Sequence, residues 1–296
     1  VLRGLKDHGY KIGGFNAYAT SDVLVGAGLS SSAAFEVVVG TIISGLYNDM
    51  KINSVEIAQI SQYAENVFFK KPCGLMDQMA CSVGGMVNID FKDPTKPIVK
   101  KVPTEFEKYD YSLCIVDTKG DHVDLTDDYA MIPSEMKKVA NFLGEDYLRD
   151  CDSNEFYIRL DEIREAVGDR PVLRAIHFFN EEYNVKNAVS SLENGKFVEF
   201  LDAIRKSGNS SFKYLQNVYT TRDIQHQNIS VALALSESLL RNYGVCRVHG
   251  GGFAGTIQAF VKNDFVSNYK EFINKIFGEN SCHVLKVRKY GGIKVM

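Results

Sequence analysis

The sequence predicts a chain of mixed helices and strands (α+β) folded as two domains, and three observations lead to this prediction. Strand-like segments flank a long stretch, from about residue 129 to residue 242, in which helical periodicity dominates. A glycine- and serine-rich loop near the N-terminus joins a strand-like segment to an apolar helical one. The charged stretch TEFEKYD separates two apolar blocks near Lys108. We therefore expect domains at residues 1–108 and 109–296.

The elements of the first domain follow from local patterns. Residues 15–23 (FNAYATSDV) alternate apolar and polar side chains, which is typical of a strand. Residues 35–46 carry apolar side chains at helical spacing and predict a well-buried helix. A second helix is expected from about Ser54, which follows a capping asparagine. Residues 86–91 and 97–102, joined by the proline-containing turn KDPTK, predict a hairpin.

The second domain is predicted to begin and end with strands. Residues 111–116 form an apolar run typical of a buried strand. The helical stretch that follows is interrupted by polar loops near 145–153 and 208–211. Strand patterns return at residues 246–261, which enclose a glycine run, and at residues 283–289.

Composition argues against several classes of protein. Hydrophobic residues make up 45% and charged residues 24% of the 296 residues, as in ordinary globular proteins. The net charge of −3 and the scattered basic residues give no reason to expect nucleic acid or a membrane surface as a partner. No transmembrane-length apolar stretch or signal peptide is visible. The six cysteines lack regular spacing and a CxxC pair, so we expect them to be reduced and the protein to be cytoplasmic.

The start of the sequence resembles the end of a helix rather than a natural beginning. Val1 stands where a methionine would be expected, and VLRGLKDHGYKIGG reads as a last helical turn and a loop. A helix usually needs its caps and its full amphipathic length. We therefore expect an N-terminal segment to be missing.

The loop GAGLSSSAA, between a predicted strand and a predicted helix, carries the main chemical signal. Glycines allow the backbone to approach a ligand closely, and the first turn of the following helix favours an anion. Three consecutive hydroxyls add donors and a possible magnesium ligand. The Walker ending GK[ST] is absent. The pattern indicates a phosphate site, although serines also cap helices commonly.

Three segments together resemble a known family. GLSSSAA is similar to the central phosphate-binding motif of the GHMP kinases, and residues 244–255 (GVCRVHGGGFAG) resemble their third motif, a glycine loop between strand and helix. KPCGLMDQ, at residues 71–78, resembles the galactokinase signature PCGIMDQ. The matches occur in family order along essentially the whole chain, so the sequence is identified as a member of this family, similar to its galactokinases.

The resemblance implies a fold and a set of nucleotide contacts. The implied fold is the two-domain α+β GHMP kinase fold, with an incomplete N-terminal domain and a ferredoxin-like C-terminal domain. The implied contacts to ATP phosphates are Gly26, Gly28, Leu29, Ser30, Ser31, Ser32 and Ala33.

The resemblance also implies the chemical residues. Asp77 becomes the catalytic carboxylate that accepts the proton of the sugar's anomeric hydroxyl, and Gly74 lies against the sugar ring. Glu65 and Ser31 hold Mg²⁺, and Tyr129 contacts the sugar. Without the resemblance, Asp77 could equally cap the following helix, and Glu65 would be a solvated helix residue. His122 is expected to be structural.

The third motif departs from the family pattern. Where members usually carry Thr-Gly-Ala-Gly, this chain has His249, Gly250, Gly251 and Gly252. His249 could contact a phosphate or pack, and we expect it to pack or to position the loop.

The implied activity is transfer of the γ-phosphoryl group of ATP to the C1 hydroxyl of galactose, with Mg²⁺. The alternatives are another GHMP small-molecule kinase and a regulator that binds galactose and ATP without turnover. A weaker alternative is a structural fragment. Because no segment matches the family's GRVNLIGEHTDY, we expect the chain as given to be inactive and prone to associate, and the intact enzyme to be a monomer.

Overall fold

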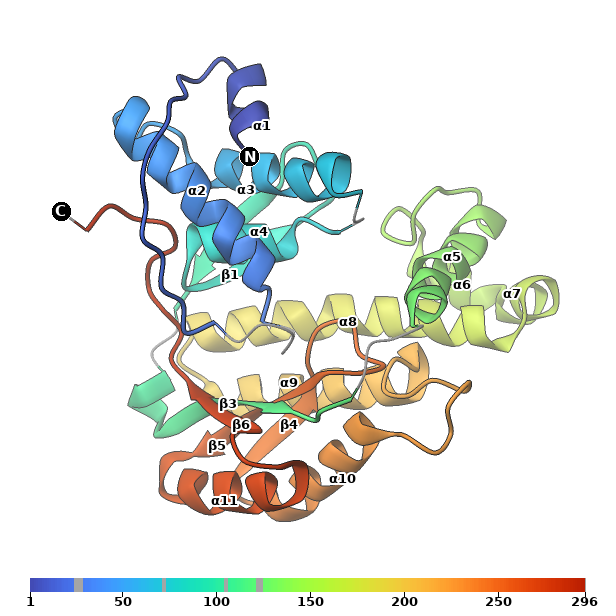
Figure 1. Ribbon diagram of the computed structural model, residues 1–296. Coiled ribbons are helices and arrows are strands. Elements are labelled where there is room, and N and C mark those ends of the chain that lie inside the picture. The colour runs from blue at the N-terminus through green and yellow to red at the C-terminus, as the bar shows by residue number, and fades with distance from the viewer. Residues whose placement is uncertain (24–28, 71–72, 104–105, 121–124, 296) are drawn as a thin grey trace. The chain divides into compact units, whose positions relative to one another are not determined.

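The chain folds into two compact units, which Figure 1 shows along the course of the polypeptide. The computed structural model describes residues 1–23, 29–70, 73–103, 106–120 and 125–295. One unit, called unit 1, comprises Val1–Thr104 and Val287–Met296, and the other, unit 2, comprises Glu105–Lys286. The sequence placed residues 287–296 with the second domain, whereas in the structure they return to the first unit. The backbone N–H of Gly85 donates to the carbonyl of Arg288 at 2.7 Å, which ties this returning segment to unit 1.

Unit 1 consists mainly of helices that pack on one another. Its elements are α1 (Leu2–Asp7), α2 (Ser31–Tyr47), α3 (Ser54–Tyr63), the π-helix η1 (Ala64–Phe68), α4 (Met76–Val83), and the antiparallel strands β1 (Met86–Asp90) and β2 (Ile98–Val102). The predicted second helix and its cap are confirmed, because Asn53 Oδ1 accepts the backbone N–H of Glu56 at 2.9 Å. The predicted hairpin is confirmed as β1 and β2.

Two predictions for unit 1 are wrong. Residues 15–23 form no strand, and most of them are exposed. An alternating pattern becomes a strand only beside a partner strand, and no strand among the described residues pairs with this segment. The helix over residues 35–46 exists as part of α2, but it is not buried all round. Phe35 and Leu46 are 64% and 58% exposed, while the opposite face, with Val37 and Ile43, lies in the core.

Unit 2 is built on a four-stranded antiparallel sheet in the order β4-β5-β3-β6. The predicted strand at residues 111–116 is confirmed as β3. The sheet is formed by β3 (Tyr111–Asp117), β4 (Gly244–Val248), β5 (Thr256–Lys262) and β6 (Cys282–Leu285). The helices are α5 (Thr126–Phe142), α6 (Ser153–Ile158), α7 (Leu160–Val167), α8 (Asp169–Glu193), α9 (Phe197–Ser210), α10 (Asn228–Leu240) and α11 (Val266–Phe277), with π-helix η3 (Ser211–Leu215) and 3₁₀ turns η2 (Phe106–Tyr109) and η4 (Asn263–Phe265).

Helices cover both faces of this sheet, as Figure 1 shows. On one face, α10 and α11 bury apolar side chains such as Leu240 and Ile273 against strand residues such as Val116 and Ile257. On the other face, α9 packs against the sheet through an aromatic cluster. Its rings are Phe106, Tyr109, Tyr111, Phe197, Phe200 and Phe260.

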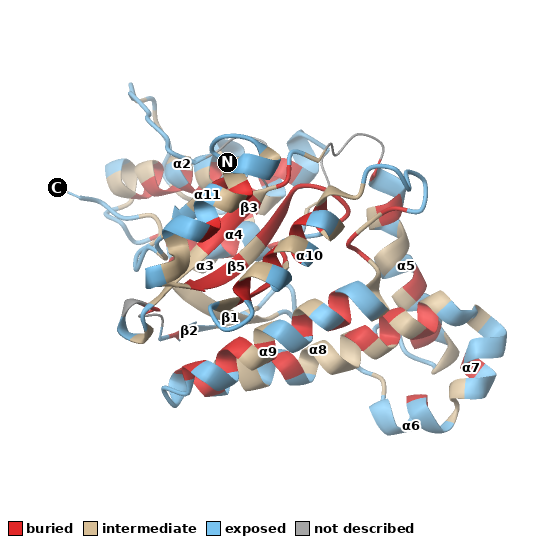
Figure 2. Cartoon of the chain, turned by 90° about the horizontal axis from the view of Figure 1, so that it is seen from below, coloured by how far each residue is buried: buried red, intermediate tan, exposed pale blue. Residues whose placement is uncertain are grey.

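One predicted loop of unit 2 is wrong, because residues 208–211 continue the helix from α9 into η3. The serines of this helix face inward instead of interrupting it: Ser210 and Ser211, like the preceding Ser207, are buried, whereas Asn209 is exposed. Gly208 allows α9 to approach β4, since a Cβ at that position would lie 2.9 Å from the Cβ of Arg247. Figure 2 shows the resulting alternation of buried and exposed faces along α8 and α9.

The loop prediction near residues 145–153 is confirmed. Among the helices of the described residues, none is both long enough and apolar enough to pass through a bilayer.

Candidate active site

The glycine- and serine-rich loop GAGLSSSAA of unit 1, called the serine loop below, leads directly into α2. Ser30 occupies the position before the helix with a left-handed backbone (φ 55°), and its hydroxyl makes no capping hydrogen bond. Instead, Ser30 Oγ donates to Asp77 Oδ2 at 2.6 Å. Ser30 therefore does not cap α2. Its hydroxyl is paired instead with Asp77, the aspartate of the segment KPCGLMDQ. Of the other predicted phosphate contacts, Leu29, Ser31, Ser32 and Ala33 are described, while Gly26 and Gly28 lie outside the described residues.

Asp77 lies in the first turn of α4 and is exposed. The N-cap position is occupied by Leu75, which makes no side-chain cap. The capping interpretation of Asp77 is therefore wrong. A negative charge in the first turn is stabilised by the helix dipole and by the Ser30 hydroxyl. The carboxylate is thus accessible and held at one oxygen. Gly74, three residues earlier, is also exposed.

Glu65 is buried, with 4% of its surface exposed, so its interpretation as a solvated helix residue is wrong. It lies in η1, where α3 widens into a π-helix, a distortion that is frequent at functional sites. Gln78 Nε2 donates to Glu65 Oε2 at 3.1 Å and approaches Cys73 Sγ at 3.6 Å. Burial, followed by the interaction with Glu65, raises the pKa of the Cys73 thiol to about 11, so this thiol stays protonated at neutral pH.

In unit 2, Tyr129 and the glycine loop come together although they are far apart in sequence. Tyr129 lies in α5, and its hydroxyl donates to the carbonyl of Gly252 at 2.8 Å. Its ring meets Phe253 edge to face, with 5.3 Å between centroids. Burial raises the pKa of Tyr129, so its hydroxyl remains a donor well above neutral pH.

The glycine loop is held by Asn217. The Asn217 side chain donates to the carbonyl of Gly251 at 3.0 Å, and its backbone carbonyl accepts the N–H of Phe253 at 2.6 Å. Gly252 has φ +83°, and a Cβ there would collide with the Asn217 carbonyl. The residue must therefore be glycine both for its backbone conformation and for the close approach.

The loop connects strand β4 to strand β5, so the expectation of a glycine loop between a strand and a helix is wrong for this chain. His249 extends the strand pairing, because its backbone N–H donates to the carbonyl of Thr256 at 3.0 Å. Its ring nitrogen Nδ1 lies 3.1 Å from Gln258 Oε1. These contacts agree with a residue that packs and positions the loop.

Sequence reasoning missed three residues of these two clusters: Gln78, Cys73 and Asn217. The first two stand inside the signature KPCGLMDQ, so the motif contained the signal, but only its glycine and aspartate were interpreted. Asn217 has no local signal, since it reaches the loop only through the fold. His122 lies outside the described residues.

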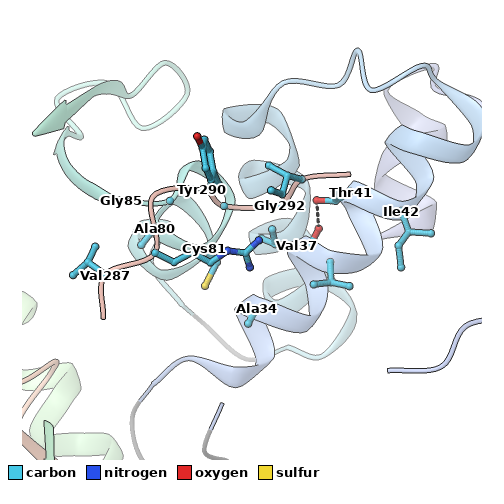
Figure 3. A pocket seen from close by; sticks show the side chains of 15 residues that line it. Ala34, Val37, Thr41, Ile42, Ala80, Cys81, Gly85, Val287, Tyr290 and Gly292 are labelled. Carbon is cyan, nitrogen blue, oxygen red and sulfur yellow. Dashed lines mark hydrogen bonds between the residues drawn. The ribbon is translucent and has the colours of Figure 1, made fainter. Parts of the chain in front are cut away.

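A cavity of about 410 Å³ lies elsewhere in unit 1. Figure 3 shows it between α2, α4 and the returning C-terminal segment, with Val37, Ala80 and Tyr290 in its wall. None of the predicted site residues lines this cavity, although Ala34, which does, follows the predicted contact Ala33. The cavity therefore lies apart from the residues proposed for the chemistry. The described residues contain no group of three or more His, Cys, Asp or Glu arranged to hold a metal.

Comparison with known proteins places this geometry in a family. The GHMP kinase N-terminal domain model matches residues 1–85. The galactokinase of Limosilactobacillus reuteri is 30% identical over 285 residues, which is 94% of this chain and 68% of that protein. The chain belongs to the galactokinase family. A second relative, the galactokinase of Streptomyces coelicolor, is 30% identical over 267 residues, covering 88% of this chain and 65% of the relative. The chain thus spans about two thirds of the length of these curated members of the galactokinase family.

Solved structures agree on the fold. Lactococcus lactis galactokinase, crystallised with galactose, aligns over 98% of this chain and 74% of its own, with a TM-score of 0.76 and 20% identity. The mevalonate kinase of L. major, crystallised with R-mevalonate, aligns over 87% of this chain and 65% of its own, with a TM-score of 0.56 and 14% identity. The two-domain α+β fold predicted for the chain is therefore the fold of the galactokinase family.

Proposed function

We propose that the protein phosphorylates galactose at its C1 hydroxyl with ATP as the phosphoryl donor. The observation that carries this proposal is the hydrogen bond between Ser30, at the end of the serine loop, and Asp77 of the galactokinase signature. It brings the segment proposed to bind phosphate next to the carboxylate proposed to receive a proton.

Asp77 orients the C1 hydroxyl and accepts its proton as the phosphoryl group is transferred. A general base must lie within hydrogen-bonding reach of the proton that it removes, and the exposed Asp77 carboxylate is free to meet a substrate at its second oxygen. Ser30 fixes the first oxygen. Gly74 provides a surface without a side chain against which a sugar ring can lie. The protein's contribution to such a transfer is positioning and charge stabilisation.

The serine loop and the first turn of α2 bind the phosphates of ATP. Backbone N–H groups at a helix start and the hydroxyls of Ser31 and Ser32 are suited to anionic oxygens. The residues of the proposed contact set are Gly26, Gly28, Leu29, Ser30, Ser31, Ser32 and Ala33.

Ser31 and Glu65 fit a role in holding Mg²⁺, because both offer oxygen and Mg²⁺ typically takes one or two carboxylates together with substrate phosphates. When bound by these residues, Mg²⁺ would neutralise charge on the phosphate oxygens. Glu65→Gln should therefore weaken magnesium-dependent nucleotide binding far more than galactose binding. Calorimetric titrations of nucleotide with and without Mg²⁺, beside a galactose titration, measure this difference; an unchanged magnesium dependence would exclude the ligand role.

In unit 2, the residues proposed for substrate binding are Tyr129 and the loop of His249, Gly250, Gly251 and Gly252. Tyr129, which packs against Phe253 and donates to the carbonyl of Gly252, contacts the sugar. His249 positions the loop through Gln258. The intact enzyme is further proposed to be a cytoplasmic monomer without nucleic-acid or membrane partners, in keeping with the free cysteines and modest net charge of this chain.

A coupled assay of ADP release tests the function. The product of the complete reading frame is assayed with ATP, Mg²⁺ and, separately, galactose, glucose and mevalonate. We expect release that depends on galactose and is much weaker with the other two acceptors. Binding of galactose and ATP without ADP release would identify a regulator instead, and a preference for mevalonate would identify another kinase of the GHMP family.

A further inference from the structure

Gln78 directly follows Asp77 in α4, but the two side chains lie in different environments. Asp77 is exposed, whereas only 1% of Gln78 is exposed. Consecutive residues of a helix point about 100° apart, so one can reach the loop while the next enters the core. An uncharged amide is costly to bury unless it is hydrogen-bonded, so its partner indicates why it is there.

The partner of Gln78 is the buried carboxylate of Glu65. The amide Nε2 donates to Glu65 Oε2 at 3.1 Å, and the same nitrogen lies 3.6 Å from Cys73 Sγ. The contact joins the first turn of α4 to the π-helix η1 across 13 residues of sequence. It therefore fixes the Glu65 side chain relative to the helix that carries Asp77.

The chemistry of the donor is also suited to a carboxylate that binds a cation. A lysine or arginine at this position would cancel the charge of Glu65 and compete with a metal ion. An amide orients the carboxylate by a hydrogen bond and leaves its negative charge in place. Groups that orient metal ligands in this way typically change metal affinity by about 10–100-fold when they are removed.

We propose that Gln78 is a positioning residue that holds Glu65 in the orientation needed for magnesium–nucleotide binding. The inference rests on the proposed function, since it assigns Glu65 the metal-binding role. Through the neighbouring Asp77, α4 then supplies both the acceptor-side carboxylate and the support for the metal-side carboxylate.

Gln78→Met is the test variant, because methionine has a similar length and shape and lacks the amide donor. Ser82→Ala is the matched control. Ser82 lies in the same helix and is also buried, and its hydroxyl donates to the carbonyl of Ser54 at 2.6 Å. Gln78→Met loses the hydrogen bond to Glu65 and the longer contact with Cys73 Sγ, and Ser82→Ala loses the one to Ser54. Only Gln78→Met loses a contact to Glu65.

Both variants are made in the product of the complete reading frame and compared with the parent. Isothermal titration of ADP at several Mg²⁺ concentrations gives the magnesium dependence of binding without requiring turnover. Steady-state ADP release gives the Mg²⁺ requirement and the galactose KM. We expect Gln78→Met to raise the Mg²⁺ concentration needed for half-maximal effect about tenfold, with an unchanged galactose KM. Ser82→Ala should lower the melting temperature similarly and leave the magnesium dependence within about twofold of the parent.

A third variant distinguishes the effect of breaking the Glu65–Gln78 hydrogen bond from the effect of moving the carboxylate. Exchanging the two groups (Glu65→Gln with Gln78→Glu) restores a carboxylate–amide hydrogen bond, so it should recover stability without recovering the magnesium dependence. Parental magnesium dependence in Gln78→Met, or in the exchanged variant, would overturn the proposal. If the parent releases no ADP with galactose, the kinase function fails, and the calorimetric comparison still decides the role of Gln78.

Discussion

The candidate residues of unit 1 meet through side-chain contacts, whereas those of unit 2 are held by the geometry of the backbone. Ser30, Asp77, Glu65 and Gln78 meet through hydroxyl, carboxylate and amide groups. In unit 2 the glycine loop has positive φ at Gly250, Gly252 and Phe253, and Tyr129 contacts a carbonyl. The two units should therefore tolerate different kinds of substitution. Unit 1 should lose chemistry when a functional group is replaced, and unit 2 should lose stability or sugar affinity when the backbone is altered.

The largest effect is expected for Asp77→Asn. The amide keeps the shape but cannot accept a proton, so turnover should fall by about 10²–10⁴-fold while ATP binding and folding stability stay close to those of the parent. ADP release and nucleotide titration measure the two quantities. Asp49→Asn is the control, since it alters an exposed carboxylate of the same unit whose positive φ of 51° suits asparagine. A variant retaining more than about a tenth of parental turnover would contradict the base role, because it falls outside that range.

Gly252→Ala should destabilise unit 2, although it removes no functional group. The added methyl group collides with the Asn217 carbonyl, and φ is +83°. Overpacking and the unfavourable backbone together should cost roughly 2–4 kcal/mol of unfolding free energy.

Gly250→Ala is the matched control for that prediction. Gly250 also has a positive φ (+68°), but a Cβ there meets nothing within 4 Å. Only the backbone penalty of about 1 kcal/mol is expected. Urea unfolding of both variants measures the two losses. Equal losses of unfolding free energy would show that the close approach to Asn217 contributes nothing. The glycine loop of unit 2 would then not depend on that backbone contact.

Tyr129→Phe should have an intermediate effect on substrate affinity. It removes the hydrogen bond to Gly252 and keeps the edge-to-face ring contact with Phe253. A single neutral hydrogen bond contributes about 1 kcal/mol to the stability of the loop. If the loosened ring and loop bind the sugar less well by the whole of that amount, the galactose KM should rise by at most about fivefold, with the ATP KM unchanged. An equal rise in both constants, measured by steady-state kinetics, would argue that the tyrosine supports the whole fold rather than the sugar side.

The smallest effect concerns pH and a buried histidine of unit 2. His177 is buried beside Ser210, with Nδ1 at 3.0 Å from its hydroxyl. Burial lowers the pKa of His177 below its ordinary 6.5; Glu181 opposes this shift and Arg247 adds to it. The unfolded chain therefore takes up a proton below about pH 6.5 that the folded chain resists, and stability falls as pH falls.

His177→Gln should reduce that acid sensitivity by up to about 1 kcal/mol between pH 7.5 and 5.5. Urea unfolding at the two pH values measures it. His226→Gln is the control, since His226 is an exposed histidine of the same unit. Identical pH dependence in parent and His177→Gln would contradict the assignment.

Sequence predicted much of this architecture wherever a pattern was local. The Asn53 cap, the hairpin of residues 86–91 and 97–102, and the strand at residues 111–116 each depend on neighbouring residues alone. The signature segment indicated Asp77 for the same reason. Residues 15–23 failed because strand formation depends on a distant partner, which an alternating pattern cannot reveal.

The remaining features depend on contacts between distant segments. The burial of Glu65 is decided by α4, and Gln78 gains its meaning only beside Glu65. Residues 208–211 look like a loop because serine and glycine are poor helix formers, but Ser210 and Ser211 are buried inside a packed helix. Asn217 reaches the glycine loop across 34 residues of sequence. Such contacts follow from tertiary packing and leave no periodicity to detect.

The position of the transferred phosphate tests the central claim most directly. The product of the complete reading frame is incubated with galactose, ATP and Mg²⁺, and the sugar product is examined by ³¹P and ¹³C NMR. The account predicts a single product with phosphate on C1, formed by the parent and absent with Asp77→Asn. Phosphate on another hydroxyl, or ATP hydrolysis without a phosphorylated sugar, would contradict the account.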